Sequence, residues 1–178
     1  MVGRYNNYHK HDHRANPWIP DSAAKEIDYC KRASELGHTM VFTTNHGMQG
    51  DTFSWIDGAS QYGLRICYGT EAYYVDNYEE KERGKHLIVM ARNTSGALQL
   101  NNLVSKAHTE GFYYRPRIDR KSLFELCPDD FIITTACVAG IWDDTELIMA
   151  LYRRFGEHFF LELQNHDMDL QKKVNRQM

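Results

Sequence analysis

Hydrophobic and polar residues alternate along this chain with two different periods, and the alternation predicts strands and helices in turn. Runs rich in β-branched and aromatic residues, which are typical of strands, cover residues 5–11, 39–44, 64–75, 86–91, 131–135 and 158–163. Apolar residues at helical spacing predict helices over residues 21–36, 51–62, 95–108, 120–126 and 143–155. Because strands and helices follow one another, the pattern indicates the α/β class, with a parallel sheet or barrel.

Polar residues mark where the expected helices begin. Asp21 and Ser22 are suitable N-caps for the first helix, since a short oxygen-bearing side chain accepts a backbone N–H of the first turn. Ser95 is placed to cap the third helix, and Asp143 with Glu146 resembles the capping box of the last one. On local grounds alone, Asp21 is therefore a helix cap.

Two of the strand-like runs form a predicted hairpin. The runs 64–75 and 86–91 are joined by the charged connector 76–85. If they pair as antiparallel strands about that connector, Glu71 and His86 fall roughly opposite one another. A carboxylate and an imidazole that are distant in sequence would then be neighbours.

Length and cysteine content limit the class of protein. The 178 residues are enough for one domain with a sizeable core and too few for two. The four cysteines are widely spaced without a CxxC pair, which fits a reducing cytoplasm. The N-terminus is polar and no apolar run approaches the roughly 18 residues of a membrane span, so we expect a soluble protein without signal peptide or anchor. The chain stops within an amphipathic stretch, and we expect the natural fold to continue beyond it.

Net charge narrows the ways in which the chain could contact nucleic acid. A net charge of −3 provides no global basic field, so any such contact must come from a local patch. Residues 111–119 form that patch, because Arg115 and Arg117 lie there among aromatic residues. Two interpretations stay open: the arginines contact backbone phosphate, or they pair with acids such as Asp119 in a packed loop.

Residue types that bind metals recur at the ends of the predicted strands. His9 and His11 are two apart on an extended segment, so their side chains point the same way. Four further candidates lie at or near the ends of hydrophobic runs: His46, Glu71, His86 and Cys137. Imidazole, carboxylate and thiolate together suit zinc better than magnesium, so the sequence predicts a zinc site. The other cysteines are expected to be buried side chains without a role in the site: Cys30, Cys67 and Cys127.

An ordered series of short motifs carries a resemblance to a known family. The motifs are residues 8–11, Asp21, 43–47, 69–73, 86–91, 111–119, 136–140 and 161–164. Together they resemble the polymerase and histidinol phosphatase (PHP) domain, in the variant that belongs to the alpha subunit of bacterial or phage-type DNA polymerase III. The likeness extends over nearly all of residues 1–178, and the run Phe-Tyr-Tyr-Arg-Pro-Arg-Ile-Asp within 111–119 is its most specific part.

The resemblance implies a fold and a set of metal ligands. The fold is a distorted (β/α)7 barrel, with two or three ions, usually Zn2+ or Mn2+, at the carboxyl ends of its strands. By the family pattern, the ligands would be His9 and His11 for the first metal, Glu71 as a bridge to a second held by His86 and Cys137, and Asp21 with His46 for the third. An alternative register would use His11 and His13 as the leading pair, but the intervals to Asp21 and His46 favour His9 and His11, which makes His13 a bystander.

Two departures from the family pattern bear on this site. Asn45 stands where the family has the aspartate of a Thr-Asp-His motif, and an amide in place of a carboxylate is expected to weaken the support of His46. The final Asp-x-His pair of the family is absent, so the domain is C-terminally incomplete. We therefore expect the site of Glu71, His86 and Cys137 to be complete, while the other two lack one protein ligand each. A water, a neighbouring chain or a separate polypeptide would fill those places.

The implied chemistry is metal-dependent phosphoester hydrolysis. In the polymerase branch, the resemblance implies a 3′→5′ proofreading exonuclease that acts on the 3′ end of a DNA primer-template, with Arg115 and Arg117 as candidates for phosphate contact. Its partners would be the rest of a polymerase chain or other replisome subunits, without a membrane. Two alternatives stay open: a catalytically inactive PHP module that supports the polymerase, and a stand-alone phosphatase for a small phosphomonoester such as histidinol phosphate.

Overall fold

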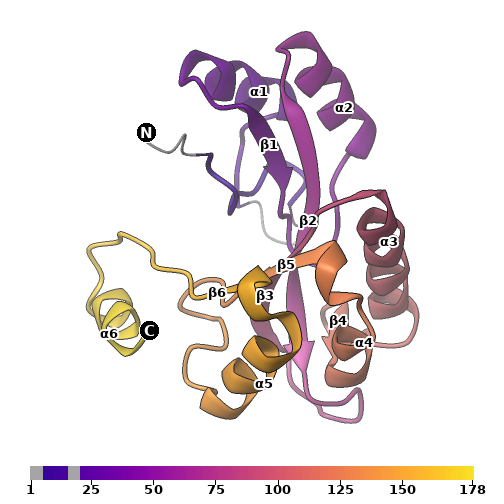
Figure 1. The fold of residues 1–178 in the computed structure, drawn as a ribbon, viewed down its shortest axis with the longest axis vertical. Coiled ribbons are helices and arrows are strands. Elements are labelled where there is room, and N and C mark those ends of the chain that lie inside the picture. Colours follow the sequence, from indigo (N-terminus) through magenta and orange to yellow (C-terminus); the bar gives the residue numbers. More distant parts are fainter. Residues whose placement is uncertain (1–5, 16–20) are drawn as a thin grey trace.

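Six strands form one mixed sheet in the computed structural model, which describes residues 6–15 and 21–178 (Figure 1). The strands are β1 (Met40–Thr43), β2 (Arg65–Val75), β3 (Lys85–Ala91), β4 (Arg117–Asp119), β5 (Phe131–Thr134) and β6 (Phe159–Phe160). Their order is β1-β2-β3-β5-β6, and β4 also pairs with β2. The β1–β2, β2–β4 and β5–β6 pairs are parallel, whereas β3 runs antiparallel to both β2 and β5. The predicted α/β class is confirmed, but the sheet is mixed.

Six helices accompany the strands in the described part of the chain, and β2 and β3 are the only consecutive strands there without a helix between them. They are α1 (Glu26–Glu35), α2 (Thr52–Gln61), α3 (Thr94–Thr109), α4 (Arg120–Phe124), α5 (Thr145–Phe155) and α6 (Asp169–Gln177), with short 3-10 turns at Pro128–Asp130 and Gly156–His158. In Figure 1, α1 and α2 lie together beside β1 at the top of the view, whereas α3, α4 and α5 lie below them, beside β3, β4 and β5. None of the helices in the described part of the chain has the length and apolar character that crossing a membrane requires.

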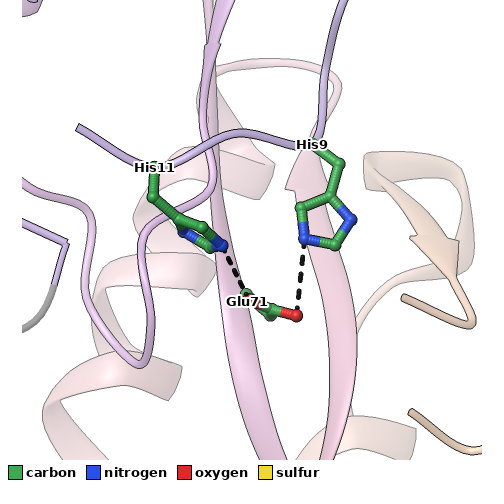
Figure 2. A group of neighbouring side chains, drawn as sticks. All are labelled: His9, His11 and Glu71. Carbon is green, nitrogen blue, oxygen red and sulfur yellow. Dashed lines mark ion pairs between the residues drawn. The ribbon is translucent and has the colours of Figure 1, made fainter. Parts of the chain in front are cut away.

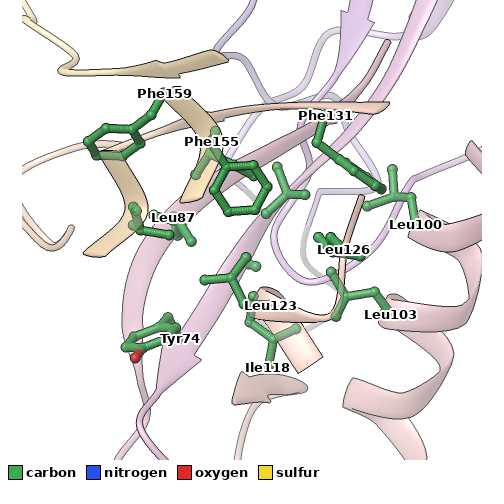
Figure 3. Close-up of a cluster of buried hydrophobic side chains, with 14 of the residues drawn as sticks. Tyr74, Leu87, Leu100, Leu103, Ile118, Leu123, Leu126, Phe131, Phe155 and Phe159 are labelled. Atoms are coloured by element: carbon green, nitrogen blue, oxygen red, sulfur yellow. The ribbon is translucent and has the colours of Figure 1, made fainter. Parts of the chain in front are cut away.

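The main hydrophobic core lies between the β2–β3 hairpin and helices α3, α4 and α5. Successive strand residues point to opposite faces, so Ala72, Tyr74, Leu87 and Val89 share the face that meets the helices. Figure 3 shows the side chains that pack there: Leu100, Leu103, Ile118, Leu123, Leu126, Phe131, Phe155 and Phe159 among others. Burying one such aliphatic side chain stabilises the fold by about 1.5–3 kcal/mol. This packing leaves the opposite face of the hairpin, which carries Glu71, for other contacts.

A smaller core lies between α1, α2 and the start of the sheet. It contains Cys30, Val41 and Trp55, and each of these side chains is almost fully buried. The prediction that Cys30 is buried is confirmed. Cys67 is only partly buried and Cys127 is exposed, so the same prediction is wrong for Cys127.

Several predicted helix starts differ from the structure by one or more residues, although local side-chain caps remain at α3 and α5. The first helix begins at Glu26, and Asp21 lies outside it. Asn93, and not Ser95, accepts the N-terminal N–H of α3 through its side chain, and Asp144, and not Asp143, does so for α5. Asp21 is thus free of the capping role that its position before a helix predicted.

The strand predictions also needed correction at three places. Residues 6–11 of the run 5–11 form no strand, residue 5 lying outside the described residues, and the predicted strand 158–163 is limited to Phe159–Phe160. Residues 117–119, expected to be part of a loop, form β4 and extend the sheet beside the end of β2. Among residues 6–15 and 21–178, no pairing joins β6 to β1, so a closed barrel is not formed by the described strands.

The predicted hairpin is confirmed with a shifted register. β2 and β3 are antiparallel neighbours, but Glu71 faces Ile88, while His86 faces Tyr73. Glu71 and His86 are therefore diagonal neighbours on one face, a separation that long side chains bridge.

Candidate metal centre

Glu71 lies at the centre of a group of four imidazoles and a thiol. Its side chain is 1% exposed. Atoms near its two carboxylate oxygens are His9 Nε2 at 3.4 Å, His11 Nε2 at 3.2 Å, His46 Nδ1 at 2.9 Å, His86 Nδ1 at 2.9 Å and Cys137 Sγ at 3.7 Å. Figure 2 shows His9 and His11 approaching the carboxylate from one segment of the chain. Five predicted ligands thus converge on the carboxylate of a sixth, Glu71.

The N-terminal segment reaches the site through side-chain contacts in place of a strand ladder. The hydroxyl of Thr44 accepts the backbone N–H of Lys10 at 2.9 Å and lies 2.9 Å from the carbonyl of Tyr8. His9 and His11 both direct a ring nitrogen at Glu71, while Lys10 between them lies over the rings of Tyr29 on α1 and Trp55 on α2. The predicted same-side placement of the two histidines is therefore present without a regular strand.

The remaining candidates come from strand ends. His46 follows β1 and is held beside Glu71 by an isolated parallel bridge, with the Gly47 N–H donating to the Glu71 carbonyl at 2.8 Å. Cys137 follows β5, and its sulfur lies 3.4 Å from His86 Nδ1. The residue before it, Ala136, has a φ of 58°, a left-handed conformation that turns the chain sharply after the strand. The carboxyl ends of β1 and β5 thus deliver side chains to the face of β2 and β3 that the helices leave uncovered.

Asp21 belongs to this group and is not a helix cap. Its Oδ2 lies 3.0 Å from His46 Nε2, while the other ring nitrogen of His46 faces Glu71. His46 therefore lies between two carboxylates. The local capping prediction for Asp21 is wrong, and its proximity to His46 is the arrangement that the family pattern implied.

Opposite charges hold protons tightly in this cluster. Burial by itself would lower the pKa of His9, but the carboxylates of Glu162 and Glu71 outweigh burial and raise it to about 10. Burial is likewise outweighed at His86, where Cys137 and Glu71 raise the pKa to about 9. Burial would raise the pKa of Glu71, yet the four surrounding imidazoles hold it well below its usual range. Positive charge, whether from protons or from a metal, is what this carboxylate requires.

The arrangement of polar atoms fits metal ions better than hydrogen bonds alone. Three buried side-chain atoms of this cluster have no hydrogen-bond partner among the described residues: His11 Nδ1, His46 Nδ1 and Glu71 Oε2. His46 Nδ1 and Glu71 Oε2 are only 2.9 Å apart, so the distance is suitable while the hydrogen-bond geometry is not. Two triads, His9–His11–Glu71 and His46–Glu71–His86, each have their three donor atoms within 4.8 Å of one another. Neutral imidazoles and a carboxylate are suitable ligands for zinc.

Glu162 supports His9 on the side away from Glu71, and the sequence indicated it only as part of the motif 161–164, without a role in the site. Its carboxylate accepts hydrogen bonds from the Tyr8 hydroxyl at 2.7 Å and from Thr134 Oγ1 at 2.8 Å, and lies 2.6 Å from His9 Nδ1. This contact fixes the ring so that Nε2 faces Glu71. Its signal was present in the sequence, since a carboxylate follows a short apolar run there, as Glu71 lies within one.

Asn45 does not contact His46 through its side chain. Its amide nitrogen donates to Asp12 Oδ2 at 2.8 Å, and its amide oxygen accepts the Asp12 backbone N–H at 3.1 Å. Both side chains are 1% exposed. The prediction that this amide weakens the support of His46 is therefore wrong, because the Asn45 side chain contacts Asp12 instead. The amide donates to the Asp12 carboxylate, which an aspartate at position 45 would repel.

The two arginines of the 111–119 patch differ in environment. Arg117 is 2% exposed and its guanidinium donates to the backbone carbonyls of Gly111, Tyr78, Glu80 and Glu82. The expectation that Arg117 contacts phosphate is therefore wrong, because its nitrogens are bonded within the fold. Arg115 instead lines an open hollow of about 320 Å³ together with Asp21, His46, Tyr73, Arg83, Gly84 and His86. Arg115 thus stays a candidate.

His13 lies apart from the Glu71 group. Its Nδ1 is 3.6 Å from Glu26, and with Asp12 these side chains form a separate acidic cluster. Arg14 lies 3.8 Å from the Glu26 carboxylate and bonds Asp51 as well, so this cluster has its own cation. The expectation that His13 is a bystander to the ligand set agrees with this position.

Comparisons with known proteins give one family and a set of relatives that share one name. The chain matches the PHP domain family over residues 8–166. It is 31% identical over 175 residues to the DNA polymerase III subunit alpha of Borreliella burgdorferi, and 31% identical over 188 and 191 residues to the subunits of that name from Thermus aquaticus and Deinococcus radiodurans. These alignments cover 89%, 94% and 94% of this chain but only 15%, 15% and 14% of the relatives. The chain thus spans a small part of the length of the proteins it matches.

Proposed function

This chain belongs to the PHP domain family, and from that premise we propose that it is a metal-dependent phosphoesterase module of a DNA polymerase III alpha-like protein. The reaction that we propose is 3′→5′ exonucleolytic hydrolysis at the primer end during DNA replication. The observation that carries the proposal is the convergence of four imidazoles and a thiol on the buried carboxylate of Glu71. The family also implies a distorted barrel, to which the mixed sheet would contribute.

Each ligand has a defined place in this proposal. His9, His11 and Glu71 would hold one ion, and their donor atoms lie within 4.8 Å of one another. Glu71 with His86 and Cys137 would hold a second, since His86 Nδ1 lies 2.9 Å from Glu71 Oε1 and Cys137 Sγ lies 3.7 Å from that oxygen and 3.4 Å from His86 Nδ1. Asp21 and His46 would hold a third. Divalent ions in these places would lower the pKa of a bound water, polarise a phosphoryl group and neutralise a leaving oxygen. Zinc suits the donor set best, and manganese is the alternative.

The chain's own residues would orient the substrate and control protons. Glu162 holds the His9 ring in one tautomer, which keeps Nε2 directed at the site. Arg115 lines the open hollow beside His46 and His86, where its positive charge would attract a phosphodiester.

A pair of measurements tests this function. The purified chain, loaded with zinc or manganese, is assayed on a 3′-recessed DNA primer and on a small phosphomonoester, with metal content determined by elemental analysis. We expect release of nucleotides from the primer, loss of that release in Glu71→Gln, and unchanged release in Glu110→Gln, where an exposed glutamate on the α3 terminus changes in the same way. A metal-loaded chain that hydrolyses only the small ester contradicts the exonuclease and favours the phosphatase; one that hydrolyses neither contradicts both.

A further inference from the structure

The hollow beside the metal centre has a positively charged rim built from two separate segments. Arg115 comes from the loop before β4, and Arg83 from the connector between β2 and β3. Among the described residues, no carboxylate lies within ion-pair distance of either guanidinium. Two guanidiniums without a carboxylate partner, beside the His46 and His86 rings that line the same hollow, favour a phosphate group as the occupant.

Gly84 places Arg83 at this rim. Its φ is 87°, and a Cβ built on it would lie 2.9 Å from the backbone carbon of Tyr73 and 3.0 Å from the carbonyl oxygen of Tyr74. The connector therefore lies directly against β2, closer than any side-chain-bearing residue allows. This close approach fixes the position from which Arg83 reaches the hollow.

Tyr114 presents an exposed aromatic ring next to the same rim. The residue is 65% exposed, and the Arg83 guanidinium lies 6.0 Å from the centre of its ring. Its φ of 57° is a left-handed conformation that a bulky aromatic residue rarely adopts. Such strain persists only where the surroundings impose it, and it is concentrated at functional sites.

A rigid support holds that ring in place. The Tyr114 ring meets the Tyr113 ring edge to face, with centroids 4.8 Å apart. Tyr113 in turn packs on the guanidinium of Arg117 at 5.2 Å, and Arg117 is anchored to backbone carbonyls. The buried arginine therefore serves the site indirectly, as the base of an aromatic platform.

We propose that Tyr114 stacks on the terminal base of a single-stranded nucleic acid while Arg83 and Arg115 hold the phosphate on its 5′ side over the metal centre. This inference rests on the proposed function, and it defines the substrate class as a strand end with an unpaired base. A base supplies the flat face that an exposed tyrosine binds, and every base has one, so the platform is tolerant of sequence. A small phosphomonoester without a base would not use Tyr114.

Binding of an oligonucleotide tests this inference separately from hydrolysis. The probe is a fluorescently labelled single-stranded oligothymidylate with a hydrolysis-resistant phosphorothioate at its 3′ terminus, and the dissociation constant is measured by fluorescence anisotropy. We expect Tyr114→Ala to weaken binding about tenfold or more, because base–aromatic stacking has effects of that size. The matched control is Tyr152→Ala on α5, which removes a tyrosine that is 58% exposed and lies away from the hollow.

A modified probe identifies stacking as the cause. When the terminal nucleotide of the oligonucleotide is abasic, the wild-type chain should bind as weakly as Tyr114→Ala, and the variant should lose nothing further. Arg83→Ala should reduce the slope of log K against log salt by about 0.7, the value for one phosphate of a single strand, while Arg153→Ala on α5 leaves the slope unchanged.

The outcomes separate the two proposals. Equal affinities of wild type, Tyr114→Ala and Tyr152→Ala for the intact probe overturn the inference, even if the chain hydrolyses primers. Primer hydrolysis by the metal-loaded chain decides the proposed function, and its absence overturns that function whatever the binding shows. Circular dichroism of each variant confirms that the fold is intact.

Discussion

Glu162 allows the account of the metal centre to be tested without touching a ligand. It is 7% exposed, and its carboxylate contacts Tyr8, His9, Thr134 and Gln164. Glu162→Gln keeps the size of the side chain and removes its charge. We expect this variant to bind zinc more weakly, because the carboxylate makes the His9 ring a better electron donor and fixes its orientation.

The size of the effect depends on pH. Loss of such a partner typically weakens metal affinity 10–100-fold, which is about 1.4–2.8 kcal/mol. A proton competes with zinc for His9, whose pKa of about 10 is raised partly by the same carboxylate. At neutral pH the variant therefore holds both the proton and the metal less tightly, and the two effects partly cancel. The loss should be smaller near neutral pH than near pH 9.

A competition titration against a chromophoric zinc chelator measures this loss at both pH values. Glu110→Gln is the matched control, because it makes the same chemical change at an exposed position. Zinc affinity in Glu162→Gln equal to wild type at both pH values, with an unchanged fold, refutes the argument that Glu162 orients His9.

Three further predictions concern the stability of the fold. In the metal-free chain, His9 and His86 have pKa values of about 10 and about 9, above the 6.5 of an unfolded imidazole. Their contribution to stability is therefore complete below about pH 6.5 and is lost as the pH rises toward 10. The midpoint of thermal unfolding should fall over that pH range. Asn45→Asp places a second carboxylate against Asp12 and should lower the free energy of unfolding in urea by about 1–3 kcal/mol. This loss of stability should be smaller in acid, where the carboxylates are protonated. A loss that does not depend on pH argues against charge repulsion. Zinc at about 100 times its dissociation constant should add about 2.7 kcal/mol of stability, and a chelator should remove it; a midpoint insensitive to zinc contradicts binding to the folded state.

Periodicity predicted those parts of the fold in which burial follows the strand or helix repeat. Two β-prone runs joined by a charged connector predicted the β2–β3 hairpin, and the structure confirms this pairing with Glu71 and His86 as diagonal neighbours. The same logic predicted that His9 and His11 share a side, even though a hydroxyl of Thr44 replaces the expected ladder. Spacing within an extended segment is a local property and does not require a partner strand.

Other residues were misjudged because their roles depend on distant partners. Asp21 satisfies the local rule for an N-cap, and only the family pattern, not its neighbours in sequence, paired it with His46, which lies 3.0 Å away. For Arg117 the sequence left open a phosphate contact or an acid partner in a packed loop, and the structure instead bonds it to carbonyls from the connector between β2 and β3. Glu162 contacts His9 because β6 pairs with β5, which brings the residues after β6 beside the N-terminal segment.

The central claim is that the side chains around Glu71 bind metal ions. The most direct test is an elemental measurement of metal per chain after purification and exchange into zinc-containing buffer, for wild type and for Glu71→Gln. Because two triads share this carboxylate, we predict at least two zinc ions per wild-type chain and a marked loss in the variant. A wild-type chain that is folded and retains no zinc above the level of a metal-free control protein contradicts the account.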